Sequence, residues 1–407
     1  MNPFFSFCLD SCVNIFLYYN IGFMYLILSR IVFHTAINLV FLYYYKLEPL
    51  NNIGLLFYAL PDNKKFFMTG GTVLEGYKPD QISDIILNKG IKNFSMLRKR
   101  LRYFFGNYYW EEVSYEDASK TVKILDIRLN NTSEVTEYIL KEQEKCFGPT
   151  DLLYEFQILK YEENNTIIIS KFDHTLSDGI GMMGFSIGLC DNYDISLFPQ
   201  MKSISFFSYL LMNLASPFYA IIALINTIKV QGRMLYSPFK REKKEVGKKI
   251  LEVSKTYNFT KFTTVAKEMG LTFNDLIITL VSKNAKKMHT KYSNNNDEFI
   301  ISIPISLRPM PKSLSEFVID NQVSNQIFKC PLINDLSEYK KVQTVLNKYL
   351  KNPFYNIGSL FNFKIGMLFT PIFVLKYTFE DSVKNVDFAI SNVPCLKLRF
   401  TMPVAKF

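Results

Sequence analysis

The sequence predicts an α/β protein built as two lobes, with a membrane-associated segment at its N-terminus. Its 407 residues are enough for two lobes that each bury a core. Short β-branched runs indicate strands, and segments with apolar residues at helical spacing indicate helices. The run from Ser11 to Tyr45 contains a single charged residue, Arg30.

Residues 1–48 are expected to form a membrane anchor or a helical hairpin in the membrane. Cys12–Ser29 is long enough to span a bilayer as a helix, and Ile31–Tyr45 is a shorter apolar block. No basic region precedes this run and no small-residue cleavage site follows it, so a cleaved signal peptide is not expected. The alternative is a pair of N-terminal helices buried within the protein.

Residues 49–200 are expected to form the N-terminal lobe. Its expected elements are a helix from Lys78–Pro79–Asp80 to Gly90, a helix over Ser133–Lys145, strands over Leu152–Lys160 and Thr166–Phe172, and a small-residue helix over Gly179–Cys190. The turn-prone Tyr161–Asn165 predicts that the two strands form a hairpin. This hairpin places His174 at the exit of its second strand.

Residues 201–250 are expected to link the lobes or to cover them as a lid. Ser203–Ile228 carries no charge and is long enough to span a bilayer, and the basic run Lys240–Lys249 follows it. Residues 251–407 are expected to form the C-terminal lobe. There, Thr272 and Asp275 have the spacing of a capping box for a helix that reaches about Met288. Phe299–Ser306 is expected to be a strand.

Composition narrows the classes of partner. A formal net charge of +10 suits an anionic partner, such as a phosphorylated cofactor or an anionic membrane surface. The basic residues are scattered, so no nucleic-acid partner is expected. None of the six cysteines forms a CxxC pair or has a His-rich neighbourhood, which favours free thiols over structural zinc or a disulfide framework. No metal site is expected.

His174 is the strongest candidate for a catalytic base. The chain has three histidines, and the other two, His34 and His289, lie in the apolar N-terminal run and at a Lys-rich helix end. His174 stands where a strand gives way to a loop, and imidazole titrates near neutral pH. Asp178 and Gly179 follow it at short spacing.

The motif His174-x-x-x-Asp178–Gly179 matches the HxxxDG signature of CoA-dependent acyltransferases with the chloramphenicol acetyltransferase fold. From about Leu50 to Pro394 the chain resembles one family of them, the wax ester synthase/diacylglycerol acyltransferases of bacteria and plants. The flanking segments that carry the resemblance, in the family's order, are Leu97–Leu101 with Trp110, Leu152–Glu155, Thr272–Asp275, Ile305–Pro309, Asn321–Ser324 and Ile390–Pro394.

The chain departs from the family pattern at several positions. Members of the family usually contain the motif HHxxxDG, and Asp173 occupies the position of its first histidine. Tyr154 replaces the tryptophan of its PLWE motif, and Cys395 replaces the glycine after its SNVP residues. The family continues beyond the position of Phe407, so the C-terminal lobe is expected to be incomplete.

The resemblance implies a fold and an activity. The fold would be the two-lobed α/β fold of chloramphenicol acetyltransferase. The activity would be O-acyl transfer from long-chain acyl-CoA to diacylglycerol or a fatty alcohol, giving triacylglycerol or wax ester. His174 would be the general base, and the chemistry needs neither a metal nor a redox cofactor. The alternative is a lipid- or acyl-CoA-binding pseudoenzyme.

The resemblance also suggests roles for other residues. Asp178 would fix the loop, with Arg308 as its candidate partner; the alternative is that Arg308 is an ordinary exposed residue. Gly179 would let the backbone approach the pantetheine arm. Candidate oxyanion or substrate contacts, which could equally be helix or turn caps, are Asn274, Ser391 and Asn392.

Asp173 precedes the candidate base directly. Side chains alternate along a strand, so Asp173 and His174 are expected to point to opposite faces. The alternative is a carboxylate beside the imidazole, which would raise the pKa of His174.

The expected location is the endoplasmic reticulum or a lipid droplet, with the catalytic part facing the cytosol; a bacterial inner membrane would also serve. A single site that contains His174 and Arg308 needs both on one side of the membrane. Ser203–Ile228 is therefore expected to dip into the bilayer, lie on it or cover the acyl tunnel, and not to cross once. Lys240–Lys249 would rest on anionic headgroups or CoA phosphates, or else be a solvated face.

Overall fold

The structure is a computed structural model. It describes residues 29, 32–33, 35–58, 67–104, 107–190, 207, 210–211, 214–215, 218–219, 222, 250–255, 257–291, 297–306, 317–361 and 386–392. Most of the expected membrane anchor, most of Ser203–Ile228, and all of Lys240–Lys249 and Arg308 lie outside these residues.

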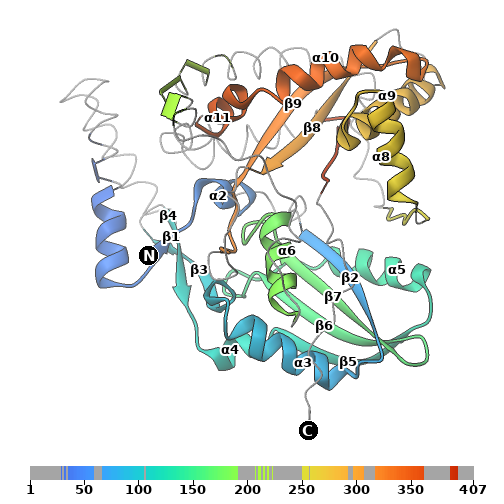
Figure 1. Ribbon diagram of the computed structural model, residues 1–407. Helices are drawn as coiled ribbons and strands as arrows, with labels where there is room; N and C mark the ends of the chain where they lie inside the picture. Colours follow the sequence, from blue (N-terminus) through green and yellow to red (C-terminus); the bar gives the residue numbers. More distant parts are fainter. Residues whose placement is uncertain are drawn as a thin grey trace.

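The described strands form two lobes, each built around a sheet, with a small β-ribbon at the side of the lower lobe (Figure 1). The strands are β1 (Glu48–Pro49), β2 (Phe67–Glu75), β3 (Lys99–Phe104), β4 (Asn107–Glu112), β5 (Val122–Leu129), β6 (Tyr154–Tyr161), β7 (Asn165–Asp173), β8 (Glu298–Ser306), β9 (Val323–Pro331) and β10 (Phe388–Ala389).

The helices pack around these sheets. They are α2 (Asn52–Tyr58), α3 (Pro79–Ile85), α4 (Tyr115–Ser119), α5 (Thr132–Gln143), α6 (Gly179–Gly188), α8 (Phe259–Glu268), α9 (Phe273–Lys291), α10 (Tyr339–Tyr349) and α11 (Pro353–Phe361), with short turns η2 (Ile86–Ile91), η3 (Ser95–Arg98) and η7 (Leu336–Glu338).

The lower sheet has the described strands in the order β2-β7-β6-β5. The predicted hairpin is confirmed, because β6 and β7 pair antiparallel with Tyr154 opposite Phe172. β2 pairs antiparallel with β7, and β5 pairs parallel with β6. β7 ends at Asp173, one residue beyond the predicted end at Phe172, so His174 is the first residue after the strand, as expected.

Side chains alternate between two cores across this sheet, as the period of a strand requires. Ile168 and Phe172 face α3 and α6 and belong to the larger core. Ile167 and Ile169 face the opposite side and pack with Ile139 of α5. Both faces of β7 are therefore buried, which explains its nearly continuous apolar sequence.

The expected end of a helix at Gly90 is wrong. α3 ends at Ile85, and the chain continues through the wider π-helical turn η2, which contains Gly90. A Cβ at Gly90 would lie 3.0 Å from the ring of Phe185. The glycine therefore serves close packing against α6, and not termination. The helix expected over Ser133–Lys145 is confirmed as α5.

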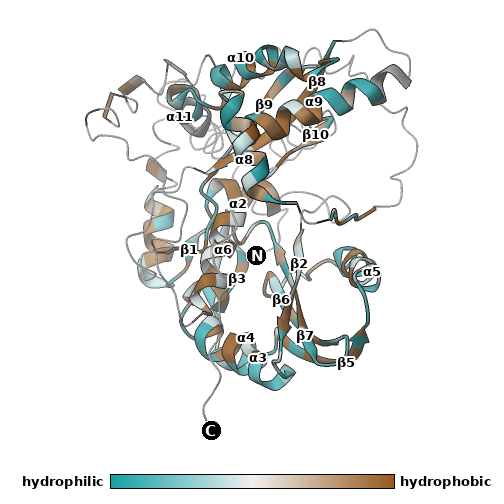
Figure 2. Ribbon diagram, turned by 45° about the vertical axis from the view of Figure 1, so that its right-hand side comes forward, coloured by the Kyte–Doolittle hydropathy of each residue, from teal (hydrophilic) through white to brown (hydrophobic). Residues whose placement is uncertain are grey.

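The upper sheet has β8 antiparallel to β9 and parallel to β10. α9 and α10 cover its apolar face, and Figure 2 shows hydrophilic residues along the outer side of α10. The predicted capping box is confirmed at the start of α9. The Asp275 backbone N–H donates to Thr272 Oγ1 over 3.2 Å, and the Thr272 N–H donates to Asp275 Oδ2 over 3.0 Å.

Residues 35–44 form a helix, called here the N-terminal helix, that packs on the ribbon β3–β4. The ring of Phe41 lies 4.9 Å from that of Tyr109, whose hydroxyl donates to Asn38 Oδ1 over 2.9 Å. This part of Ile31–Tyr45 therefore contacts protein on one face. Among the described residues, no helix combines the length and the apolar character needed to cross a bilayer.

A segment from the upper half of the molecule joins the two lobes. Phe317 and Ile319, just before β9, are buried, and Ile319 belongs to the core of the lower lobe. The ring of Phe317 lies so close to Gly184 of α6 that a Cβ there would sit 1.9 Å from it. Only a glycine fits at this point of α6.

Candidate active site

The His174 turn connects β7 to α6 at the junction of the two lobes. β7 ends at Asp173, residues 174–176 turn, and α6 begins at Gly179. Asp178 has extended backbone and caps the helix. The turn therefore follows directly from the sequence: an apolar strand stops, and Asp178 starts the next helix.

His174 is partly buried, and one face of its imidazole is covered by another aromatic ring. The ring of Phe57, from α2, stacks on it with centroids 4.1 Å apart and planes inclined by 20°. Its Nδ1 is buried and has no hydrogen-bond partner within the described part of the chain. Nε2 is therefore the ring nitrogen left to meet a substrate.

Burial lowers the pKa of His174 below its ordinary value of 6.5. Its own backbone carbonyl and the carboxylates of Asp178 and Asp173 act in the opposite direction, and so does Asn321, but burial outweighs them. The ring is consequently neutral at physiological pH. A neutral imidazole can accept a proton, which is the state a general base requires.

Asp173 continues the series Ile167 and Ile169 along β7, the side that faces α5. Its Oδ1 accepts a hydrogen bond from the Thr175 backbone N–H over 2.8 Å. The carboxylate thus supports the turn, while its charge raises the pKa of His174 less than burial lowers it.

Asp178 links the two halves of the chain. Its Oδ1 accepts from the Gly181 N–H of α6, and its Oδ2 accepts from the Gln322 N–H before β9, each over 2.8 Å. The Asp178 N–H in turn donates to the Asp320 carbonyl over 3.3 Å. Asp178 therefore orients the turn and the interlobe segment together.

Asn321 holds the turn from the same segment. Its Nδ2 donates to the carbonyl oxygens of His174 and Thr175 over 2.8 and 3.1 Å. Ser177 adds a hydrogen bond from its Oγ to the Asp320 carbonyl over 3.1 Å. Residues about 145 positions apart in sequence thus fix the backbone on either side of the imidazole.

The other predicted site residues lie as follows. Gly179 is the first residue of α6. Asn274 and Asn392 meet each other, since Asn392 Nδ2 donates to Asn274 Oδ1, and Ser391 is exposed beside them. Among the described residues, no hydrogen bond joins this pair to the His174 turn. The cap of α9 is Thr272, and not Asn274.

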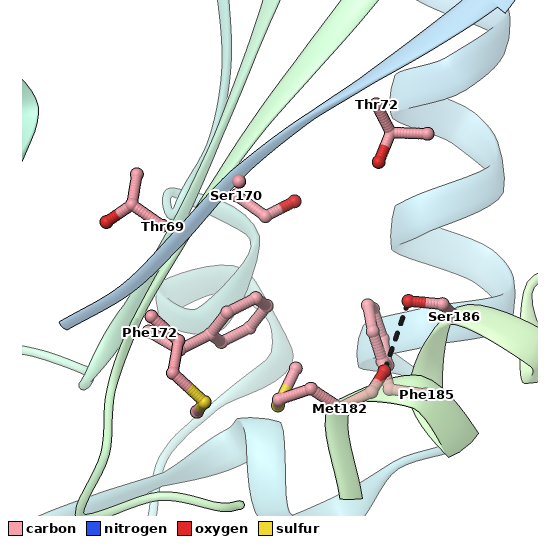
Figure 3. Close-up of a pocket in the computed structure, with 9 residues that line it drawn as sticks. Thr69, Thr72, Ser170, Phe172, Met182, Phe185 and Ser186 are labelled. Carbon is pink, nitrogen blue, oxygen red and sulfur yellow. Dashed lines mark hydrogen bonds between the residues drawn. The ribbon is translucent and has the colours of Figure 1, made fainter. Parts of the chain in front are cut away.

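A pocket of about 300 Å³ lies between β2, β7 and α6 (Figure 3). Its apolar lining comes from Met68, Phe172, Met182 and Phe185, and its polar lining from Thr69, Thr72, Ser170 and Ser186. No charged side chain lines it. His174 does not line this pocket, but the pocket follows the strand and the helix that flank the His174 turn.

The described part of the chain brings together no group of three or more His, Cys, Asp or Glu side chains suited to a metal ion. Phe57 and the Asn321 side chain contact the His174 turn, and neither contact was predicted from the sequence. Gly54 and Phe57, three residues apart, offered a weak signal, since that spacing places both on one helix face.

The fold is similar to that of condensation domains. The first condensation domain of the calcium-dependent antibiotic synthetase aligns with a TM-score of 0.51 at 12% identity, over 79% of this chain and 78% of that one. The cyclization-docking bidomain of EpoB from Sorangium cellulosum aligns with a TM-score of 0.50 at 14% identity, over 75% and 63%. No family model and no curated protein matches the chain.

The protein therefore has a mixed α/β, condensation-domain-like fold. The two-lobed α/β fold expected from the sequence is confirmed at this level. The particular wax ester synthase/diacylglycerol acyltransferase family is a narrower assignment, which belongs to the proposal below.

Replacing Asp178 with alanine should destabilise the protein more than the loss of an ordinary helix cap. The cap contributes about 1 kcal/mol, and a hydrogen bond to a charged acceptor about 1.5–3 kcal/mol, so we expect a loss of roughly 2–4 kcal/mol. Urea unfolding measures it. The control is Asn131→Ala, which removes the exposed cap of α5. Equal losses for the two variants would mean that the bond to Gln322 contributes nothing.

Proposed function

We propose that this protein is an O-acyltransferase that moves a fatty acyl group from acyl-CoA to a hydrophobic alcohol. The observation that carries the proposal is the state of His174: a neutral imidazole at the lobe junction, with Nδ1 enclosed and Nε2 left for a substrate. The condensation-domain-like fold and the HxxxDG motif support the same reaction class.

The proposed reaction needs one base. His174 Nε2 takes the hydroxyl proton of the alcohol as its oxygen attacks the thioester carbonyl. The tetrahedral oxyanion then collapses, the C–S bond breaks, and the imidazolium returns the proton to the departing CoA sulfur. Asp178 and Asn321 take no part in bond making; they hold the backbone of the turn.

Diacylglycerol and fatty alcohol are the proposed acceptors. Their support is the resemblance to the wax ester synthase/diacylglycerol acyltransferase family. The pocket beside β7 is compatible with this proposal, because it has no charged lining residue and because Met68, Phe172, Met182 and Phe185 offer apolar contacts to a hydrocarbon chain. We propose that it receives the chain of one of the two substrates.

Replacing His174 with alanine should reduce ester formation by about 10²–10⁴-fold. Membranes that contain the full chain are incubated with labelled acyl-CoA and either diacylglycerol or fatty alcohol, and the esters are separated. Because burial lowers the pKa of His174, the wild-type rate should fall on the acid side only below pH 6.5.

Ser254→Ala, at an exposed position outside the candidate site, is the control in this assay and should stay active. If wild type and His174→Ala form ester equally, or neither forms any while acyl-CoA still binds, the proposal fails and a lipid-binding pseudoenzyme is the better account.

Gly70→Leu tests the pocket. A Cβ at Gly70 meets no atom within 4 Å, so the larger side chain fills the pocket without disturbing the strand. We expect the rate with long chains to fall roughly tenfold and that with short chains to be unchanged. Varying the acyl length and the alcohol length in separate series shows which chain the pocket holds.

The matched control for Gly70→Leu is Val73→Leu, an exposed position of β2 opposite Ile167, on the side that faces α5. Loss of rate at every chain length, or at none, would contradict the assignment of the pocket.

We propose that the N-terminal helix contacts a membrane. Phe41 faces the ribbon, and the helix leaves apolar and aromatic side chains exposed at Leu39, Val40, Leu42, Tyr43 and Tyr44. Tyr43 and Tyr44 are 73% and 75% exposed. Tyrosines beside aliphatic residues are typical of a membrane interface, and the apolar run that begins at Ser11 leads directly into this helix.

The double variant Leu39→Glu/Tyr43→Glu should bind vesicles of phosphatidylcholine and phosphatidylserine several-fold more weakly than wild type, because charge at the interface is costly. Co-sedimentation measures the bound fraction. Ile124→Glu/Val73→Glu places the same charges on exposed apolar positions of the lower sheet and should leave binding unchanged. Unchanged binding by the first variant would refute contact through this helix.

A further inference from the structure

A short helix from the start of the chain packs directly against the His174 turn. α2 is held in place at both ends: the Leu50 N–H before it donates to the Tyr108 carbonyl over 2.9 Å, and the ring of Tyr58 at its end lies 4.7 Å from that of Tyr108. Its Ile53 and Leu56 are buried. α2 is therefore a fixed part of the lower lobe.

Gly54 is the point of closest approach between α2 and the turn. A Cβ at this position would lie 2.9 Å from the carbonyl oxygen of Thr175, which is backbone and cannot move aside cheaply. The Gly54 N–H donates to Asn51 Oδ1 over 2.6 Å, which fixes the first turn of the helix. Only glycine lets the helix reach the carbonyl this closely.

The same carbonyl receives a second group from the other half of the chain. Thr175 O accepts from Asn321 Nδ2 over 3.1 Å, and that Nδ2 also reaches the His174 carbonyl. The backbone of the turn is thus enclosed between Gly54 and Asn321. The Gly54 contact acts on the position of the backbone that carries the imidazole, and Asn321 acts on that backbone and also raises the pKa of His174.

Phe57 extends this contact to the imidazole itself. It lies three residues after Gly54, on the same face of the helix, and its ring stacks on that of His174 at 4.1 Å. A stacked aromatic ring keeps water off one face of the imidazole and restricts its rotation. It also attracts an imidazolium weakly.

We propose that α2 positions the base: Gly54 seats the helix on the Thr175 carbonyl, and Phe57 is a positioning residue that holds the His174 ring in one orientation and excludes water from it. This inference rests on the proposed role of His174 as the base. According to the proposal, Gly54 and Phe57, which lie outside the HxxxDG motif, determine the orientation of the His174 ring and its shielding from water.

The charges around the ring determine what the loss of Phe57 would do. Three elements near the ring carry carboxylates: Asp178 before α6 and Asp173 at the end of β7, which both raise the pKa of His174, and Asp320 in the segment that carries Asn321. α2 itself has no charged residue. If Phe57 acts mainly by excluding water, its removal lets the carboxylates and solvent stabilise the imidazolium, and the pKa of His174 rises.

The test titrates His174 directly, so that it does not depend on the reaction. In the variant His34→Gln/His289→Gln, His174 is the only histidine, and its ¹³C-labelled ring signal reports protonation by NMR. Adding Phe57→Ala should shift its titration to higher pH, while Phe57→Tyr, which keeps the flat ring, should restore the original midpoint.

Leu55→Ala is the matched control, because Leu55 lies on the same helix and packs against the main core. It should lower stability without moving the His174 midpoint. In the acyl-transfer assay, Phe57→Ala and Gly54→Ala should each lower kcat/KM by roughly tenfold. For Phe57→Ala, the acid limb of the pH–rate profile should also move to higher pH.

An unchanged or lowered midpoint in Phe57→Ala would overturn the inference, and so would an equal upward shift in Leu55→Ala. These outcomes differ from failure of the proposed function: if the protein forms no ester, the NMR titration still shows whether Phe57 controls the imidazole.

Discussion

The geometry of the candidate site depends on one carboxylate shared between two halves of the chain. Asp178 accepts the Gly181 N–H of α6 and the Gln322 N–H before β9 at the same length. The first bond begins the helix that follows the HxxxDG motif, and the second ties that helix to the upper lobe. Because burying a carboxylate without hydrogen bonds is costly, these two bonds stabilise the arrangement in which α6 and the segment before β9 lie together.

Close approach between backbones is the second constraint. Phe317 occupies the space that a side chain at Gly184 would need, Phe185 does the same at Gly90, and the Thr175 carbonyl does so at Gly54. In each case a glycine lets one element settle against another without a cavity between them. These three contacts surround α6 and the His174 turn, so the rigidity of the site comes from packing as much as from hydrogen bonds.

In the proposed reaction, burial determines the protonation state of the base. Four groups favour the imidazolium, namely the His174 carbonyl, Asp178, Asp173 and Asn321, yet burial keeps the pKa of His174 below its ordinary value. A base that is neutral at physiological pH needs no partner to remove its proton before each cycle. The enclosed Nδ1 leaves Nε2 as the nitrogen available to a substrate, and so gives the base a direction as well as a protonation state.

Local sequence was sufficient to predict the elements around the motif. The β6–β7 hairpin, α5, α6 and the cap of α9 follow from periodicity and capping residues, which are short-range properties. The position of His174 at a strand exit and the condensation-domain-like fold were also readable, the fold through the motif series. Gly90 misled the prediction, because a glycine that ends a helix and one that admits a neighbouring ring look alike in sequence.

What only the tertiary structure decided is which distant groups surround the imidazole. Phe57 and Asn321 lie 117 residues before and 147 residues after His174, and no periodicity connects them to it. The lowered pKa of His174 likewise follows from enclosure by α2 and the segment before β9. Sequence determines propensity along the chain, whereas burial and contact at a site depend on how separate elements meet in space.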